Sequence, residues 1–98
     1  MERTEIVLEG RKGEIQRFSD DKKAGKMDIS IIGKKLTVYH TEVDPQFEGK
    51  GFAKILLERL VSYARENDLK ILPLCPFVHA QFKRHPEEYN DVWLKEEA

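Results

Sequence analysis

The sequence predicts an α+β fold in which a mainly antiparallel sheet packs against two main helices. Three observations lead to this prediction. Strand-like segments fill the first half of the chain, an amphipathic helical stripe begins at residue 53, and a glycine-containing loop joins the two parts. No linker or internal repeat divides the 98 residues, a length that suits one hydrophobic core, so we expect a single domain over residues 1–98.

The first half of the chain alternates apolar and polar residues, as strands do. We expect strands at 13–18, 27–32 and 36–43, with the last two joined by a hairpin turn at Gly33-Lys34-Lys35 and a solvated turn at 20–25. In all, three or four antiparallel strands are expected. Strict alternation would put four side chains of the last strand on one face, namely Leu36, Val38, His40 and Glu42.

The second half changes to the helical period of 3.6 residues. Apolar residues recur at helical spacing over 53–64, and Asn67-Asp68 is expected to end that helix. A short buried strand is expected at 69–74, paired in parallel after the helix crossover, and a second helix from Pro76 to about Arg84. In the tail, from His85 onward, we expect a turn and a short helix that dock onto the domain through Tyr89, Val92 and Trp93.

Composition excludes several classes of protein. Lys and Arg number 17 against 18 Asp and Glu, a formal charge of −1, so nothing in the overall charge favours nucleic acid as a partner. No apolar run approaches the roughly 20 residues that span a bilayer, so no membrane segment is expected. With Cys75 as the single cysteine, no intrachain disulfide can form, and we expect a cytoplasmic protein.

The junction between the strand at 36–43 and the first helix has the features of an anion site. A helix start leaves backbone N–H groups unpaired and carries about half a positive charge, which suits phosphate. Gly49 and Gly51 let the backbone approach phosphate oxygens without a Cβ, and Lys50 could add a cation. Glu48 is unfavourable beside an anion and is expected to point away.

Two familiar phosphate loops do not fit this junction. The dinucleotide-binding pattern needs a glycine or small residue three places after the second glycine, where Lys54 stands. The Walker loop needs Gly-Lys-Ser/Thr, whereas Phe52 follows Gly51. By itself Gly-x-Gly is also compatible with an ordinary tight turn.

The pattern that does fit is Gln-x-x-Gly-x-Gly at 46–51, which resembles the pyrophosphate signature of the GNAT superfamily of acyl-CoA N-acyltransferases. Two flanking segments, His40-Thr41-Glu42-Val43 and Pro73-Leu74-Cys75-Pro76-Phe77-Val78, resemble a branch of very short, stand-alone GNAT-like N-acetyltransferases. The resemblance covers residues 13 to 93, with the three motifs in the order and spacing of that branch. It implies a minimal GNAT fold without the C-terminal arm of larger members.

The same resemblance implies acetyl-CoA as the co-substrate, lying between two diverging strands at 36–43 and 69–74. Its pantetheine is expected to pair with backbone near Glu42 and Val43 like an added strand. The residues expected to bind it are Val43, Gln46, Phe47, Glu48, Gly49, Lys50, Gly51, Phe52 and Ala53. No metal is expected, because His79 and Cys75 on one helix face are too few ligands for zinc.

Three residues are candidates for catalysis. Cys75 stands where a helix should begin, a position that favours thiolate, and the family places it near the thioester, so it could accept the acetyl group before transfer. Alternatively it is a small buried hydrophobic residue. His40 or Glu42 could take the proton of the incoming amine or of Cys75, and a structural histidine is the alternative for His40.

The resemblance therefore implies transfer of an acetyl group from acetyl-CoA to an amine acceptor, either a small molecule or a protein lysine. A different class stays open. So small a domain could bind acyl-CoA without catalysis, or serve as an interaction module that binds no coenzyme.

Overall fold

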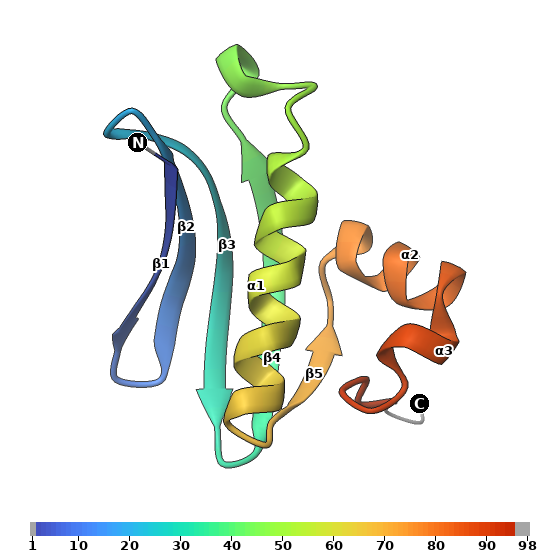
Figure 1. Ribbon diagram of the computed structural model, residues 1–98. Coiled ribbons are helices and arrows are strands. Elements are labelled where there is room, and N and C mark those ends of the chain that lie inside the picture. Colours follow the sequence, from blue (N-terminus) through green and yellow to red (C-terminus); the bar gives the residue numbers. More distant parts are fainter. Residues whose placement is uncertain (1, 96–98) are drawn as a thin grey trace.

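A computed structural model describes residues 2–95 and shows one five-stranded sheet with α1 packed on one face (Figure 1). In sheet order the strands are β1 (Glu2–Glu9), β2 (Lys12–Ser19), β3 (Lys22–Ile32), β4 (Lys35–Val43) and β5 (Lys70–Pro73). The helices are a 3₁₀ turn η1 (Pro45–Phe47), then α1 (Phe52–Glu66), α2 (Pro76–Arg84) and the four-residue α3 (Pro86–Tyr89). The predicted α+β class is confirmed: β1 to β4 pair antiparallel, and α1 and α2 are the main helices.

The strands of the first half are longer than the alternation predicted. β1 precedes the first strand that the pattern placed, and β3 begins at Lys22. The expected turn at 20–25 is therefore wrong in extent. Only Asp20 and Asp21 form it, both with positive φ, as a two-residue hairpin turn requires. Ala24, expected in that turn, is instead fully buried in β3.

The second half follows the prediction closely. α1 begins one residue earlier than expected, at Phe52, and ends before Asn67, although Asp68 rather than Asn67 takes the left-handed conformation. β5 pairs in parallel with β4 and ends at Pro73, and α2 has the predicted bounds.

The core lies between α1 and the middle strands. The stripe of α1, including Leu56, Leu57 and Leu60, is buried against residues such as Met27 and Val38 of the sheet. Full burial of such a side chain is worth about 1.5–3 kcal/mol. This packing fixes the start of α1 near the end of β4, where the predicted loop lies (Figure 1).

The tail extends the sheet beyond β5. The Ile71 N–H donates to Val92 O at 2.6 Å, and the Leu94 N–H donates back to Ile71 O at 2.8 Å. Tyr89 and Val92 are buried and Trp93 is half-buried, so the predicted docking through these residues is confirmed.

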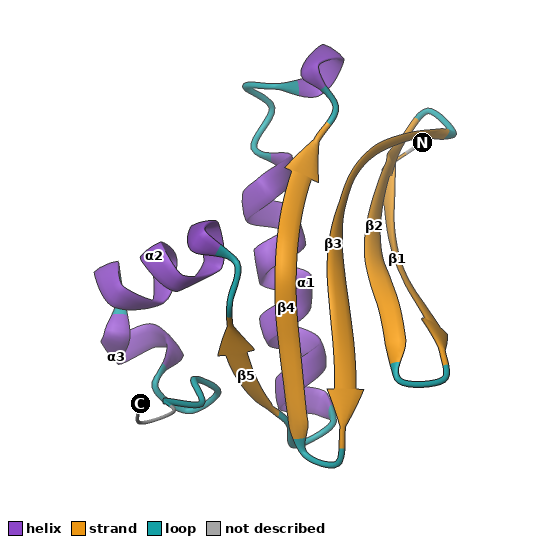
Figure 2. Cartoon of the chain, turned by 180° about the vertical axis from the view of Figure 1, so that it is seen from behind, coloured by secondary structure: helices purple, strands orange, loops and turns teal. Residues whose placement is uncertain are grey.

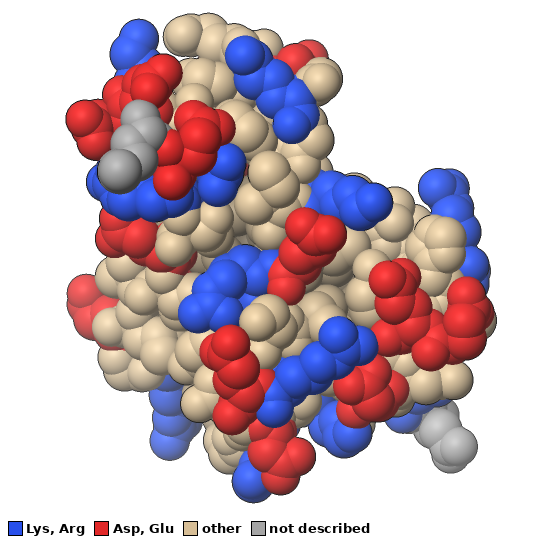
Figure 3. All heavy atoms as spheres, viewed as in Figure 1, with Lys and Arg blue, Asp and Glu red and all other residues tan. Residues whose placement is uncertain are grey.

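The other face of the sheet is uncovered. Seen from behind, β3 and β4 lie in front of α1, and no helix of the part described here crosses in front of them (Figure 2). On the helix-bearing side, lysine and arginine are interspersed with acidic residues rather than gathered into one basic area (Figure 3). Within residues 2–95, no helix has the length and apolar character needed to cross a membrane.

Candidate active site

The predicted phosphate loop runs from the end of β4 to the start of α1 and has a defined backbone. The Asp44 carboxylate accepts a hydrogen bond from the Gln46 N–H at 2.9 Å, which orders the 3₁₀ turn. Gly49 and Gly51 have φ of +82° and +76°, a region that residues with a Cβ rarely adopt. A Cβ built at either glycine would meet nothing within 4 Å, so both positions open toward free space. Glu48, Gly49, Lys50 and Gly51 are exposed.

The start of α1 presents unpaired donors beside these glycines. The Ile55 N–H makes the first helical bond, to Gly51 O at 3.1 Å, and no side chain caps the helix. The amides of Phe52, Ala53 and Lys54 therefore have no partner within the helix. Together with the positive end of the helix dipole, they form a site that suits a diphosphate.

A largely covered arginine supports this helix start from the sheet. The Arg17 guanidinium lies 5.0 Å from the centroid of the Phe52 ring, and its side chain is only 12% exposed. It donates to Thr4 Oγ1 and pairs with Glu2 at 3.1 Å. Phe52 in turn stacks on Phe47, with ring centroids 5.9 Å apart. Strand β1 is thereby linked to the loop through two intermediate side chains.

A cleft of about 690 Å³ continues from the helix start between α1 and the α2–α3 pair. Its walls include Gly51 just before α1, Lys54 of α1, Phe77 and Gln81 of α2, and His85 just after α2. The sequence did not mark Lys54 and Gln81 as site residues, since each reads as an ordinary polar residue on a helix surface. They line one cleft only because of the angle between α1 and α2, which the sequence does not show.

The strands β4 and β5 separate where the resemblance expects the thioester arm. Their parallel pairing ends with Val38 opposite Pro73, and β4 runs five residues further to Val43. Within residues 2–95, no strand pairs with positions 40–43 on that side. Val38 O instead accepts the N–H groups of Leu74 and Cys75, at 3.1 and 3.0 Å, as the chain turns into α2.

A β-bulge changes the orientation of the end of β4. Asp28 pairs with His40 but Ile29 pairs with Val38, so Tyr39 has no partner in the register. Opposed residues of an antiparallel pair share a face, and an extra residue inverts the alternation that follows it. The expectation that His40 and Glu42 share a face with Leu36 and Val38 is therefore wrong.

After the bulge, His40 and Glu42 lie on the uncovered face. They are 58% and 57% exposed, and His40 Nε2 is 3.5 Å from a Glu42 carboxylate oxygen. Thr41, opposite the buried Met27, turns to the helix side. The structure thus brings the two candidate bases together.

Cys75 lies on the helix side of the sheet and is 2% exposed. Its Sγ is 3.2 Å from Thr41 Oγ1, and it is the residue before α2, as the sequence predicted. The bulge therefore separates Cys75 from His40 and Glu42 across the sheet. An imidazole at position 40 is not placed to take a proton from this thiol.

Lys26 of β3 connects Glu42 to two further carboxylates. Its Nζ lies 3.1 Å from Asp28, 3.8 Å from Glu14 and 3.8 Å from Glu42. The hydrogen bond to Asp28 raises the pKa of Lys26 despite some desolvation, with smaller contributions from the charges of Asp28, Glu14 and Glu42. Across residues 2–95, no group of three or more His, Cys, Asp or Glu side chains could hold a metal ion.

Comparison with known proteins places this geometry in a family. A family model described as GCN5-related N-acetyl-transferase matches residues 14–92. An NMR structure of a GCN5-like putative N-acetyltransferase from Staphylococcus aureus is similar, with 29% identity, TM-score 0.65, and coverage of 95% of this chain and 90% of that one. A comparison with curated protein sequences gives no match.

Longer enzymes share the fold at lower identity. The ribosomal-protein-S18-alanine N-acetyltransferase of Escherichia coli has TM-score 0.63 and 19% identity, over 67% of this chain and 43% of that one. The PaiA N-acetyltransferase of Thermoplasma acidophilum, in complex with coenzyme A, has TM-score 0.60 and 15% identity, over 80% and 50%. The chain thus spans about half the length of these two enzymes or less. With the family model covering most of its residues, the chain belongs to the GCN5-related N-acetyltransferase family.

Proposed function

We propose that this protein transfers the acetyl group of acetyl-CoA to an amine acceptor. The observation that carries the proposal is the start of α1. There, three amides without helical partners and two left-handed glycines with open space above them adjoin an unpaired stretch of β4. The diphosphate would bind the amides, and the pantetheine would lie along residues 40–43 as an added strand. Family membership and the coenzyme A complex of the PaiA enzyme support the same assignment.

Direct transfer of the acetyl group from the coenzyme to the amine agrees with the position of the candidate bases on the sheet. Glu42 and His40 lie together on the uncovered face, where an amine can approach and lose its proton. The amine nitrogen then attacks the thioester carbonyl, the C–S bond breaks, and coenzyme A leaves as a thiolate that takes up a proton. An unpaired N–H on the β4 edge would stabilise the oxyanion. Holding both reactants in one geometry supplies much of the rate.

The alternative route through an acetyl-cysteine finds less support. The Cys75 sulfur is buried against Thr41, on the side of the sheet away from both candidate bases. We therefore expect Cys75→Ala to keep turnover within a few-fold of the native rate. Loss of turnover with unchanged affinity for acetyl-CoA, in a folded variant, would favour the covalent route instead.

Two measurements on the native protein test the function itself. Calorimetric titration with acetyl-CoA reports binding, and release of free thiol with a panel of amines reports transfer. Binding with turnover is the expected result. Binding without turnover on any amine would favour a non-catalytic acyl-CoA-binding module, and absence of binding would favour a plain interaction domain.

The family fold is compatible with more than one class of amine acceptor. Similar structures include an alanine N-acetyltransferase of a ribosomal protein and an aminoglycoside acetyltransferase in complex with sisomicin. Their identities of 19% and 10% show a shared fold, so both a small amine and a protein amine are compatible with it. We propose a location inside the cell, where acetyl-CoA is made.

A further inference from the structure

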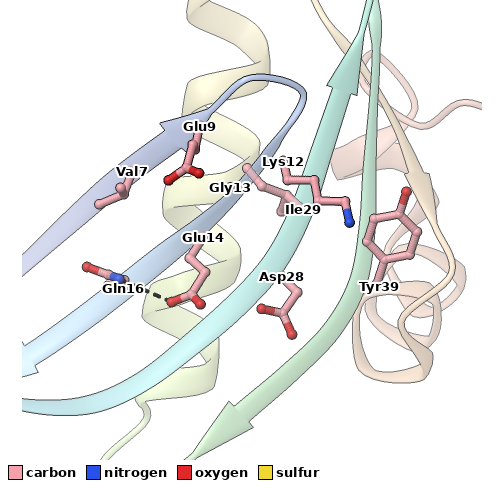
Figure 4. Close-up of a pocket in the computed structure, with 9 residues that line it drawn as sticks. All are labelled: Val7, Glu9, Lys12, Gly13, Glu14, Gln16, Asp28, Ile29 and Tyr39. Atoms are coloured by element: carbon pink, nitrogen blue, oxygen red, sulfur yellow. Dashed lines mark hydrogen bonds between the residues drawn. The ribbon is translucent and has the colours of Figure 1, made fainter.

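The uncovered face of the sheet contains a hollow of about 730 Å³. Its lining comes from β1, β2, β3 and β4 and includes Val7, Glu9, Lys12, Glu14, Asp28 and Tyr39 (Figure 4). The sticks lie in front of the sheet with α1 behind it, on the side to which the bulge turns His40 and Glu42. A hollow of this size falls in the range that small ligands occupy.

The register of the sheet aligns part of this hollow with the candidate bases. Glu14 of β2 is opposite Asp28 of β3, and Asp28 is opposite His40 of β4. Neighbouring strands are about 4.8 Å apart, so the two carboxylates begin roughly 5 and 10 Å from His40 along one row across the sheet. Glu42 stands beside His40, so the row leads from two carboxylates to the place where an amine would lose its proton.

Both carboxylates of this row already form ion pairs with lysine side chains of the protein itself. Lys23 Nζ lies 2.6 Å from Glu14, and Lys26 Nζ lies 3.1 Å from Asp28. Both lysines are partly exposed, so a soluble ammonium group can compete with them. With these two lysines counted, Glu9, Glu14 and Asp28 are balanced by Lys12, Lys23 and Lys26, so an ammonium group of the acceptor would bind by displacing a lysine and not through an excess of negative charge.

We propose that the hollow binds the acceptor, and that the acceptor is a small aliphatic amine with a second ammonium group about 5–10 Å from the reacting nitrogen. This rests on the proposed function and names its substrate class, an aliphatic diamine or polyamine. Glu14 and Asp28 hold the distal ammonium group. The reacting ammonium group gives one proton to Glu42 or His40, its nitrogen bonds to the acetyl carbon, and the C–S bond breaks. The nitrogen loses a second proton as the amide forms, and the coenzyme thiolate takes one up.

The lining of the hollow also suits an aliphatic chain between two amines. Apolar contacts from Val7 and Tyr39 suit the methylene chain of a diamine.

The test compares two acceptors of equal length, 1,4-diaminobutane and 1-aminobutane, as the ratio of their kcat/KM values. The native protein is expected to prefer the diamine. Glu14→Gln and Asp28→Asn should each lower that ratio by up to roughly 5-fold, the range for partly exposed charge pairs. Glu66→Gln, which removes an exposed carboxylate on α1 that pairs with Arg59, is the matched control and should leave the ratio unchanged.

A fourth variant is expected to change the ratio in the opposite direction. Lys26→Met removes the ammonium group that competes for Asp28, so the KM for 1,4-diaminobutane should fall, a gain that partial unfolding cannot produce. Equal kcat/KM for the two amines, or better turnover of a lysine-containing peptide than of the diamine, would overturn the proposal. Either result still shows acetyl transfer, whereas failure of the proposed function would appear as no turnover of any amine.

Discussion

Replacing Gly51 by alanine separates the role of this residue in folding from its role in binding the coenzyme. Gly51 precedes α1 with φ +76°, and an alanine in the left-handed conformation costs about 1–2 kcal/mol. In a domain of this size each kcal/mol lowers Tm by about 4–8 °C, so a fall of about 5–15 °C is expected. The added Cβ touches nothing in the free protein, so stability carries no further cost.

The added Cβ should weaken the binding of acetyl-CoA, although it touches nothing in the free protein. The Cβ would stand in the open space where a phosphate oxygen approaches the amides of α1. Loss of one hydrogen bond to a charged group costs about 1.5–3 kcal/mol, which corresponds to roughly 10- to 150-fold weaker binding of acetyl-CoA by calorimetry.

Gly33→Ala provides the matched control for this substitution. Gly33 has φ +60° and also has nothing near its Cβ, but it lies in the β3–β4 turn at the other end of β4. It should lose similar stability and keep native affinity. If both alanine variants bind acetyl-CoA as the native protein does, the diphosphate does not lie at the start of α1.

Three further predictions follow from other contacts. Phe82→Ala should lower the free energy of unfolding by about 3–5 kcal/mol in urea titrations, because the ring is fully buried in the core. Arg17→Met should raise the KM for acetyl-CoA more than it lowers kcat, because it removes the support of Phe52; an unchanged KM would contradict that link. The hydrogen bond from Arg65 lowers the pKa of Asp91, so this pair stabilises the fold above the unfolded pKa of about 3.9 and stops doing so as pH falls through the lower folded value. Asp91→Asn should therefore unfold more easily than the native protein at pH 7, and the difference between their urea midpoints should shrink as the pH falls below about 3.9.

Local patterns predicted most of the fold. The hairpin at Gly33, the helical stripe of α1 and the Pro76 start of α2 each depend on residues close in sequence, and each is confirmed. The loop could be found for the same reason, since the glycines and the helix start are neighbours in the chain. Its role as the diphosphate site stays a prediction.

The remaining parts of the site depend on pairing between distant segments. Nothing in the sequence of β4 marks Tyr39 as an extra residue, because the bulge appears only in the register against Asp28 and Ile29. The row from Glu14 to His40 depends on that register too. The cleft that Lys54 shares with Gln81 depends on the angle between two helices. Single-sequence patterns carry no information on such pairings.

The bulge makes the pairing register of β4 as important as the identity of its residues. If β4 straightened with Tyr39 in place, strict alternation would drive an imidazole and a carboxylate into the hydrocarbon interior beneath α1 and expel Thr41 to solvent. Deleting Tyr39 itself would leave His40, Thr41 and Glu42 on their present faces, because the extra residue is the one removed. A segment grafted in place of β4 must therefore keep the pairing of His40 with Asp28, whether or not it keeps the bulge.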